Sequence, residues 1–421
     1  MNSYRWMKTD TASIMFSCLS TKKWGRTFRM AAIFKDKDVD PELLAKAARD
    51  IMPRYPITYS SLRKGFFWNY QVGTDLLPEI RQENSRALMP ICYSTSGRPD
   101  FRLVYYKKRL AMESAHHLGD GKGAGEYFNA LLERYADLLD DPESVYTPEE
   151  PEEKELENAY ITNFQKGGEI AEEDSGEAYH IPGTIEKNFV QMIYALIPVE
   201  QICKMAKDKE MTVTEYVTSA LILGTIKNAG KPVNEPINIA IPVNLRRFFP
   251  SETIRNFVIQ SKIEFSPDGR TDWTFDEVCQ KVKGQLKARL VPSELQKILN
   301  RFGLLATNPV LRLVPNFIKQ PVLRAKQAKS HNCFTTIFTN TGEAVLSDKL
   351  KEKIERFDGV NGDTSGYGLI STCSAVSANG FFNLCFSICS HDTSWPKECV
   401  RVLSAQGLDI RIESTNGNGE E

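Results

Sequence analysis

The stretch RLAMESAHHLGDGKGAGE, residues 109–126, decides the fold of this 421-residue chain. Its first part, Leu110 to Ala115, is mostly apolar and predicts a largely buried strand. A glycine-rich corner follows, and we expect a helix from Glu126 to Leu139 after it. The strand therefore holds His116 and His117 at a fixed place where the corner begins.

The corner combines a histidine with an aspartate four residues later and a glycine directly after the aspartate. Histidine is the side chain whose usual pKa suits general-base chemistry near neutral pH. We expect Asp120 to turn away from His116 and to brace the corner. Positive φ values and a sharp bend are expected from the four glycines of this segment: Gly119, Gly121, Gly123 and Gly125.

The two histidines also have a structural interpretation. A His-His pair at a strand end is often a polar strand terminus, or one satisfied histidine of the core. Two features favour the catalytic interpretation: the complete His-x-x-x-Asp-Gly spacing, and its place between a predicted strand and a predicted helix.

The spacing His116-x-x-x-Asp120-Gly121 resembles the active-site motif of the chloramphenicol-acetyltransferase-like superfamily. This superfamily includes plant acyl-CoA-dependent acyltransferases, condensation domains of peptide synthetases, wax-ester synthases, polyketide-associated acyltransferases and bacterial alcohol acetyltransferases. Many members carry two adjacent histidines, and the second is the base. Counting back from Asp120, the resemblance makes His116 the base, with Ala115 in place of the usual first histidine. His117 is then an additional histidine inside the motif.

A second part of the resemblance lies in Pro242-Val243-Asn244-Leu245-Arg246, at the end of a strand in which apolar residues alternate. In the superfamily, a Pro-x-x-x-Arg segment at this stage supplies the arginine that pairs with the motif aspartate. The resemblance therefore implies a structural ion pair between Arg246 and Asp120 that joins the two halves of the chain. Arg247 and Arg255 are alternative partners.

Composition excludes several classes of protein. The formal net charge of −1 gives no overall field that would attract nucleic acid. The nine cysteines are scattered without a C-x-x-C pair, which favours reduced, buried thiols in a cytoplasmic protein over disulfides or a metal site. The first residues lack the apolar core of a signal peptide, and no uncharged apolar run reaches the ~18–20 residues of a membrane span.

We expect an α/β protein of two similar sandwich subdomains, each a mixed sheet with helices on one side. The N-terminal subdomain spans residues 1–140 and carries the His-x-x-x-Asp-Gly corner. Residues 141–180 form an acidic crossover, and the C-terminal subdomain spans residues 181–421. The order strand, turn, strand, corner, helix recurs around His391, but no Asp-Gly follows four residues later. We therefore predict one active site, and the resemblance implies that it lies in a channel between the subdomains.

Three further segments carry predictions. The aromatic run GFFWNYQ, residues 65–71, predicts a strand, and packing in the core is favoured over a substrate wall. Residues 73–99 are expected to be loop, and Leu350 to Phe357 a short helix. Residues 281–330 carry eleven Lys/Arg and one acid, Glu294, between apolar clusters. This segment predicts either a surface for coenzyme A phosphates, an anionic acceptor or a lipid interface, or an ordinary basic helical face.

The resemblance implies direct acyl transfer. His116 removes a proton from an acceptor hydroxyl or amine, which attacks the thioester of acyl-CoA, and the same histidine protonates the thiolate that leaves. Acyl-CoA is then a co-substrate, and no permanently bound cofactor or metal is expected. The acceptor is a small or lipid-like alcohol or amine, with peripheral membrane contact among the options. Candidates for substrate contact or oxyanion stabilisation are Thr335, Thr336, Thr339 and Asn340.

Two alternatives remain open at this point. One is a condensation-type enzyme whose acyl donor is carried in trans by a carrier protein. The other is a non-catalytic binding protein with the same fold. The Asp-Phe-Gly-Trp-Gly motif of plant members is absent, as it also is in bacterial alcohol acetyltransferases, so the resemblance is nearest to the latter.

Overall fold

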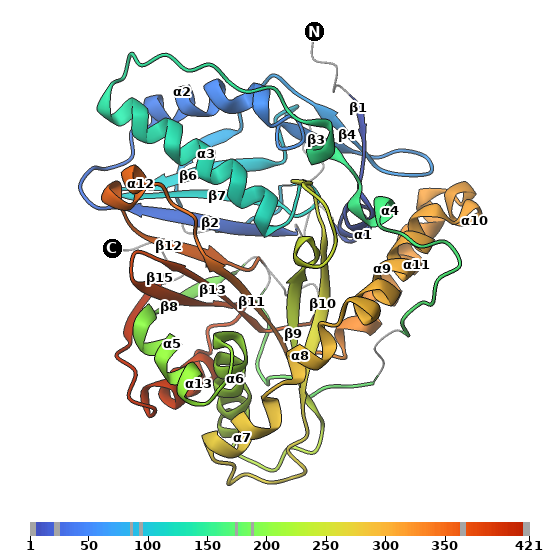
Figure 1. Cartoon of the computed structure of the whole chain (residues 1–421), viewed down its shortest axis with the longest axis vertical. Helices are drawn as coiled ribbons and strands as arrows, with labels where there is room; N and C mark the ends of the chain where they lie inside the picture. The colour runs from blue at the N-terminus through green and yellow to red at the C-terminus, as the bar shows by residue number, and fades with distance from the viewer. Residues whose placement is uncertain are drawn as a thin grey trace.

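The computed structural model describes residues 6–20, 26–84, 87–91, 96–172, 176–186, 189–362 and 368–415 (Figure 1). The described chain is a mixed α/β structure with two large sheets that lie one above the other in Figure 1. The predicted α/β class and the arrangement as two lobes are confirmed.

The first lobe is built on a five-stranded sheet in the order β12-β2-β7-β6-β5. Only β5 and β6 are parallel, so the sheet is mixed. Its strands are β2 (Thr27–Phe34), β5 (Glu79–Gln82), β6 (Phe101–Tyr106), β7 (Arg109–Ala115) and β12 (Ile354–Val360). Helices α2 (Pro41–Ile51) and α3 (Gly121–Asp140) bury their apolar sides against this sheet. The β5 strand lies in the segment expected to be loop, so that prediction was wrong there.

The second lobe is built on a seven-stranded sheet in the order β10-β9-β11-β13-β14-β8-β15. Here β11 is parallel to both of its neighbours, and the other pairs are antiparallel. The strands are β8 (Gln191–Pro198), β9 (Ile237–Asn244), β10 (Val258–Phe265), β11 (Thr336–Glu343), β13 (Ser371–Ala378), β14 (Phe381–Ile388) and β15 (Arg411–Thr415).

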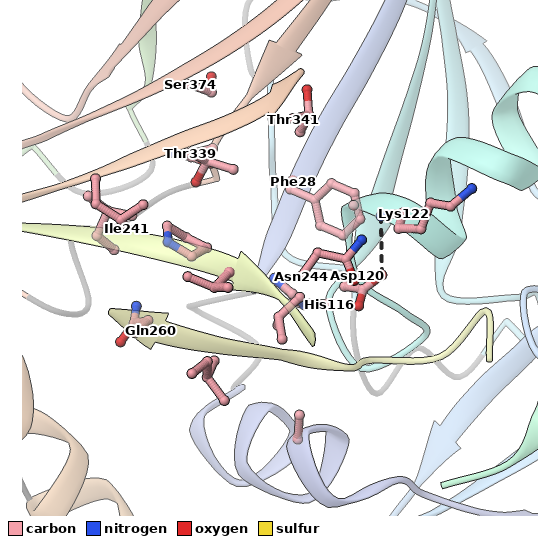
Figure 2. Close-up of a pocket in the computed structure, with 18 of the residues that line it drawn as sticks. Phe28, His116, Asp120, Lys122, Ile241, Asn244, Gln260, Thr339, Thr341 and Ser374 are labelled. Carbon is pink, nitrogen blue, oxygen red and sulfur yellow. Dashed lines mark hydrogen bonds between the residues drawn. The ribbon is translucent and has the colours of Figure 1, made fainter. Parts of the chain in front are cut away.

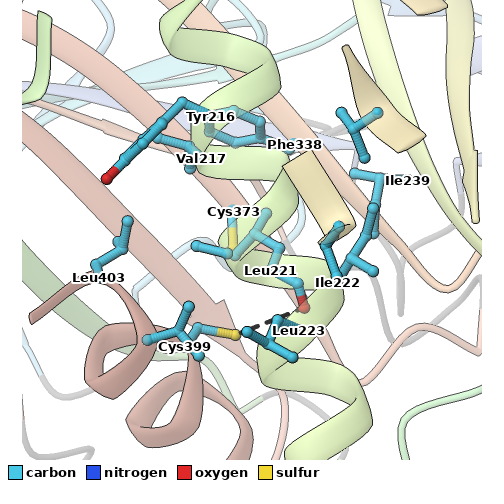
Figure 3. Close-up of a cluster of buried hydrophobic side chains, with 14 of the residues drawn as sticks. Tyr216, Val217, Leu221, Ile222, Leu223, Ile239, Phe338, Cys373, Cys399 and Leu403 are labelled. Atoms are coloured by element: carbon cyan, nitrogen blue, oxygen red, sulfur yellow. Dashed lines mark hydrogen bonds between the residues drawn. The ribbon is translucent and has the colours of Figure 1, made fainter. Parts of the chain in front are cut away.

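The core of the second lobe lies between its sheet and the helices α5 (Val199–Asp208), α6 (Val213–Ala229), α7 (Phe275–Val282) and α13 (Ser394–Ser404). Figure 3 shows its centre, where Leu221 of α6 lies among residues of the sheet and of α13. Every residue from 215 to 226 of α6 is buried, so apolar side chains lie around its whole circumference. The buried hydroxyls of Thr218, Ser219 and Thr225 donate to the backbone of the preceding turn. The alternation in β9 predicted one buried face, but both faces of that strand are largely covered.

One strand of the first sheet comes from the second half of the chain. Strand β12 pairs antiparallel with β2, with Asp358 opposite Ala31. The helix predicted over residues 350–357 is wrong in its second part, because α12 (Asp348–Lys353) ends where β12 begins. The boundaries predicted at residues 140 and 181 remain a prediction. Strand β12, which comes after residue 181, belongs to the sheet of the first lobe.

Local sequence signals explain where several helices begin. The Asp40 side chain accepts hydrogen bonds from the first turn of α2, and Pro41 is its first residue. A capping box between Thr212 and Glu215 begins α6. Helix α13 begins at Ser394, and Pro396 lies in its first turn.

The remaining elements border the two lobes. A small sheet has the order β1-β4-β3, and three helices, α9 to α11, form an arm on the right of Figure 1. The bounds are β1 (Trp6–Lys8), β3 (Ser60–Arg63), β4 (Tyr70–Gly73), α1 (Thr11–Leu19), α4 (Ala159–Thr162), α8 (Gln285–Arg289), α9 (Pro292–Thr307), α10 (Pro309–Leu313), α11 (Asn316–His331), and the short 3-10 helices Met52–Arg54, Glu153–Leu156 and Leu245–Arg247. No helix in the described part of the chain has the length and apolar character needed to cross a membrane.

The strand predicted over residues 65–71 is wrong for residues 65–69, and only Tyr70 and Gln71 belong to a strand, β4. Residues 65–69 connect β3 to β4, and the Phe66 and Phe67 side chains are exposed. Neither ring is in the core, and neither lines the cavity described below. Packing in the core therefore does not explain why Phe66 and Phe67 are aromatic.

Candidate active site

A cavity of about 1270 Å³ lies between the two lobes (Figure 2). One side is formed by β2, by the corner after β7 and by the first turns of α3. The other side is formed by β9, β10, β11 and the arm helices. Both lobes are thus needed to complete its wall. Of the two adjacent histidines, His116 lines this cavity and His117 does not.

The His116 ring is oriented by an asparagine from the other lobe. The Asn256 amide donates from Nδ2 to the His116 backbone oxygen at 3.0 Å and to Ser13 Oγ at 3.1 Å. Its Oδ1 therefore faces His116 Nδ1, at 3.1 Å, and accepts a hydrogen bond from it. This contact places the ring proton on Nδ1. No described residue hydrogen-bonds to Nε2, so its lone pair is available on the cavity side.

Two phenylalanine rings enclose the imidazole. Phe16 of α1 stacks on it with ring centroids 4.0 Å apart, and Phe28 of β2 meets it edge-on at 5.2 Å. Burial lowers the pKa of His116 below its usual value, although a hydrogen bond to backbone, the Asp120 charge and Asn256 act in the opposite direction. The ring is therefore neutral at neutral pH, which is the state that a general base requires.

His117 lies outside the cavity, and its contacts stabilise the fold. Its Nε2 lies 3.0 Å from Asp100 Oδ2, and both side chains are buried. Its backbone oxygen accepts hydrogen bonds from Ser13 and Gln71. These contacts fix the chain beside His116.

Asp120 braces the corner, as the sequence suggested. Its Oδ1 caps α3 by accepting from the backbone N–H groups of Lys122 and Gly123, each at 3.1 Å. Its Oδ2 accepts from Arg246 Nη1 and from the Phe257 backbone N–H, each at 2.8 Å. The ion pair implied between Asp120 and Arg246 is thus present, and it joins the two lobes beside His116.

The two alternative arginines have other positions. Arg255 is buried, and its Nε lies 3.6 Å from Asp10 Oδ2, where Asp10 is the N-cap of α1. Arg247 is exposed and lines the cavity. Neither pairs with Asp120.

The role predicted for the corner glycines was wrong. None of the four has a positive φ. Two are required by a close approach of the other lobe: a Cβ on Gly123 would lie 1.7 Å from the Ile254 carbonyl oxygen, and one on Gly119 would lie 2.8 Å from it. Gly121 begins α3, and a Cβ there would meet its nearest atom, in Met30, at an ordinary 3.8 Å.

The candidates on β11 separate into two groups. Thr335 and Thr336 are buried away from the cavity: Thr335 Oγ1 accepts from the Asn238 backbone, and Thr336 Oγ1 donates to the Ser371 backbone. As oxyanion donors these two candidates are not supported. Thr339 and Asn340 line the cavity, and Figure 2 shows the Thr339 side chain there.

Several polar groups line the cavity and can donate into it, among them the side chains of Asn244, Gln260 and Thr339. Asn340 donates one N–H of its Nδ2 to Thr214 Oγ1 at 3.1 Å, which leaves the second N–H for another acceptor. No described residue accepts from the Thr339 hydroxyl. Asn244 also lines the cavity, with Oδ1 accepting from Arg246 and Nδ2 left for another acceptor. Among the described residues, no group of three His, Cys, Asp or Glu side chains is arranged to hold a metal ion.

Sequence reasoning missed Asn256, Asp10, Ser13 and Phe16. Asp10 and Ser13 had a detectable signal, because Asp-x-x-Ser before an apolar run is typical of a helix N-terminus, and α1 begins there. Asn256 lies in an irregular segment before β10 and shows no pattern in the sequence. Of the other histidines, His180 and His391 are exposed and lie outside the cavity. His331 lines the cavity, where its Nε2 lies 2.9 Å from Gln327 Nε2, and burial lowers its pKa to about 3.

Comparison with known proteins shows the fold. No family model and no curated protein sequence matches this chain. Solved structures do match over nearly the whole chain. Polyketide synthase associated protein 5 from Mycobacterium tuberculosis is 15% identical with a TM-score of 0.59, covering 94% of this chain and 96% of that one.

Two further structures extend the comparison. F. graminearum TRI101, complexed with coenzyme A and T-2 mycotoxin, is 10% identical with a TM-score of 0.62, covering 95% of this chain and 97% of its own. The nonribosomal peptide synthetase FmoA3 is 13% identical with a TM-score of 0.61, and 96% of this chain matches 42% of that larger chain. The chain therefore has the fold of the chloramphenicol-acetyltransferase-like proteins and condensation domains, as the motif suggested.

Proposed function

We propose that this protein is an acyltransferase that moves an acyl group from acyl-CoA to a hydroxyl or amine acceptor, with His116 as the general base. The observation that carries the proposal is the orientation of His116. Asn256 holds Nδ1 in its protonated form, burial keeps the ring neutral, and Nε2 is left available at the cavity between the lobes. The coenzyme A bound by TRI101 supports the choice of donor, because the two proteins share this fold.

The reaction proceeds by direct transfer. His116 Nε2 takes the proton of the acceptor hydroxyl as its oxygen attacks the carbonyl carbon of the thioester. The tetrahedral intermediate carries the negative charge on the former carbonyl oxygen. When the carbon–sulfur bond breaks, the coenzyme A thiolate takes the proton back from Nε2, and the histidine is neutral again. Atoms and charge balance without a covalent acyl-enzyme.

The cavity also supplies groups for the remaining steps. The Thr339 hydroxyl and Asn244 Nδ2 are two candidate donors to the oxyanion, and loss of one such donor typically costs about 10²- to 10³-fold in kcat. Arg247, Arg301 and Lys326 line the cavity and carry positive charge that suits the phosphates of coenzyme A. Asp120 and Arg246 hold the corner and take no part in proton transfer.

The test is release of the coenzyme A thiol from donors ranging from acetyl-CoA to palmitoyl-CoA, with mixed alcohols and amines as acceptors. We expect release that depends on the acceptor in the wild type and that His116→Ala abolishes. A His391→Ala variant is the control, because His391 is exposed and lies outside the cavity. Equal release from His116→Ala would contradict the proposal.

The same experiment separates the other interpretations. If the wild type releases no thiol from any donor, the next test is an acyl group carried on a carrier protein, as the match to a peptide synthetase would suggest. If neither donor reacts, the chain is a binding protein. An alcohol acetyltransferase, the nearest resemblance in sequence, would prefer acetyl-CoA and an alcohol.

A further inference from the structure

The arm helices expose apolar side chains in an unusual arrangement. Five of these side chains and two from the connection between β3 and β4 form what is here called the arm face: Val310, Leu313, Phe317, Ile318 and Val322, with Phe66 and Phe67. Each is between 41% and 72% exposed. A soluble surface rarely gathers large apolar residues in this way without a ligand or partner.

The first half of helix α11 buries polar side chains and exposes apolar ones. The side chains that it buries include Asn316 and Lys319, while Phe317, Ile318 and Val322 face outward. Lys319 Nζ lies 3.1 Å from the centre of the Trp68 ring and 3.1 Å from the Leu311 backbone oxygen. The polar residues thus fix α11 in place, so the outward apolar residues are not needed to hold the helix.

The connection between β3 and β4 is fastened to the same helix. The Asn316 backbone N–H donates to the Phe66 backbone oxygen at 2.7 Å, and Asn316 Nδ2 donates to the Gly65 backbone oxygen at 2.8 Å. The Phe66 and Phe317 rings are 6.4 Å apart. These contacts join the aromatic tip at residues 66–67 and the outer side of α11 in one continuous surface.

The charge of this surface has a single sign. The sequence has no acidic residue from 295 to 342, nor from 60 to 74. Exposed cationic residues accompany the arm face: Lys64, Arg312, Arg324 and Lys329. Apolar side chains surrounded by cations are the chemistry that binds an anionic lipid surface, where the apolar groups enter the interface and the cations meet the headgroups.

The same helices form the wall of the cavity. Leu311 of α10 and Leu323 of α11 line the cavity, while their neighbours Val310 and Val322 face outward. Phe302 and Leu305 of α9 continue the apolar lining. One layer of helices therefore separates the candidate active site from the arm face. In Figure 1, α10 is at the outer end of this arm.

We propose that the arm face docks the protein on an anionic lipid bilayer and that the acceptor reaches the cavity from that bilayer. The second part rests on the proposed acyltransferase function, whereas the docking does not. A protein partner is disfavoured because the apolar residues are on the outer end of an arm and not in a groove. The acceptor class that follows is a lipid-borne alcohol or amine.

The test is flotation of the full chain with vesicles of phosphatidylcholine alone or with 30 mol% phosphatidylglycerol, at a physiological salt concentration of about 0.15 M. We expect flotation with the anionic vesicles and at least about tenfold less with the neutral ones. The double variant Phe317→Ser/Val322→Ser should reduce binding to anionic vesicles about tenfold or more. Because both side chains are exposed, the thermal melting of this variant should match that of the wild type.

A second pair of variants tests the charges. Lys64→Glu/Arg312→Glu should also abolish flotation, while the matched control Lys204→Glu/Lys207→Glu on α5, far from the arm in Figure 1, should not. Wild type that does not float with anionic vesicles, or a Phe317→Ser/Val322→Ser protein that floats equally well, would overturn the docking.

Enzymatic activity is measured separately. Thiol release with a water-soluble acceptor should be unchanged by the variants of the arm face, and release with an acceptor embedded in vesicles should fall in parallel with flotation. If thiol release is absent in every protein but flotation follows the variants as expected, the proposed function fails and the docking stands. If release occurs from vesicle acceptors equally in all variants, delivery from the bilayer is overturned.

Discussion

Two corners of this molecule are built in the same order and do different work. In the first lobe, the hairpin β6–β7 leads through His116 to α3, and in the second lobe the hairpin β13–β14 leads through His391 to α13. The first corner contacts the second lobe, and buried residues surround its histidine and hydrogen-bond to it. The second corner faces solvent, where His391 packs only against Phe189, with ring centroids 4.2 Å apart, among the described contacts.

The aspartates of the two corners show the difference most clearly. Asp120 caps α3, pairs with Arg246 and accepts the Phe257 N–H, so one side chain connects a helix to two segments of the opposite lobe. Among the described residues, Asp392 accepts hydrogen bonds from the neighbouring Ser394 alone, at 2.8 Å from its N–H. A hairpin, a corner and a helix are therefore not sufficient for a site. Contact with the second lobe supplies the remaining groups.

The largest difference is expected in activity. His116→Ala should lower kcat/KM by about 10²- to 10⁴-fold, since that is the usual contribution of a general base, whereas His391→Ala should leave it within about twofold. Steady-state thiol release measures both. If the two variants lose activity equally, the two corners are not distinguished by function.

The next difference is in stability. Asp120→Asn removes one partner of a buried ion pair and should lower the free energy of unfolding by about 3–5 kcal/mol. Asp392→Asn, at an exposed corner, should lower it by less than about 1 kcal/mol. Urea denaturation followed by circular dichroism compares the two variants. Similar midpoints for both would contradict a stabilising role of the ion pair between Asp120 and Arg246.

A smaller effect separates two glycines of the first corner. Gly123→Ala places a Cβ against the Ile254 carbonyl oxygen and should cost about 1–3 kcal/mol through displacement of the opposite lobe. Gly121→Ala has room and should be neutral or slightly stabilising, because alanine favours a helix. Thermal melts compare the two variants, and Gly121→Ala should have the higher melting temperature. If Gly121 is needed for its backbone conformation, Gly121→Ala will have the lower one.

The smallest predicted effect concerns pH. Because burial lowers the pKa of His116, the ring stays neutral as pH falls through the usual histidine value of about 6.5. The acid limb of kcat/KM should therefore lie below pH 6.5, as measured with a donor and an acceptor that do not titrate in this range. An acid limb at or above pH 6.5 would mean that the surroundings of His116 favour its charged form.

The sequence predicted those parts of the fold that depend on local signals. Strand β2, the capped helices α2 and α6 and the hairpin at Asn379-Gly380 follow from apolar pattern, capping residues and turn residues. Prediction from the sequence failed where contacts between distant parts of the chain determine the structure. The register of β12 depends on pairing with β2, over 300 residues away. The aromatic composition of residues 65–69 is typical of a core strand, but Phe66 and Phe67 are exposed in the structure.

The candidate site was predictable to a similar extent. The motif identified His116 and Asp120, and the resemblance added Arg246. Asn256 could not be found, because its role arises only where an irregular segment of the second lobe meets the corner of the first. The glycines were identified for the wrong reason, since the need for glycine comes from the approach of Ile254 and not from φ.

The central claim is that the first corner holds His116 as a neutral ring with its proton on Nδ1 and Nε2 free. The chain has five histidines, so selective ¹⁵N labelling with a long-range ¹H–¹⁵N spectrum at pH 6.5 can report on each, using His116→Gln for assignment. We predict a protonated Nδ1 and an unprotonated Nε2 for His116. An imidazolium, or a ring with its proton on Nε2, would contradict the account.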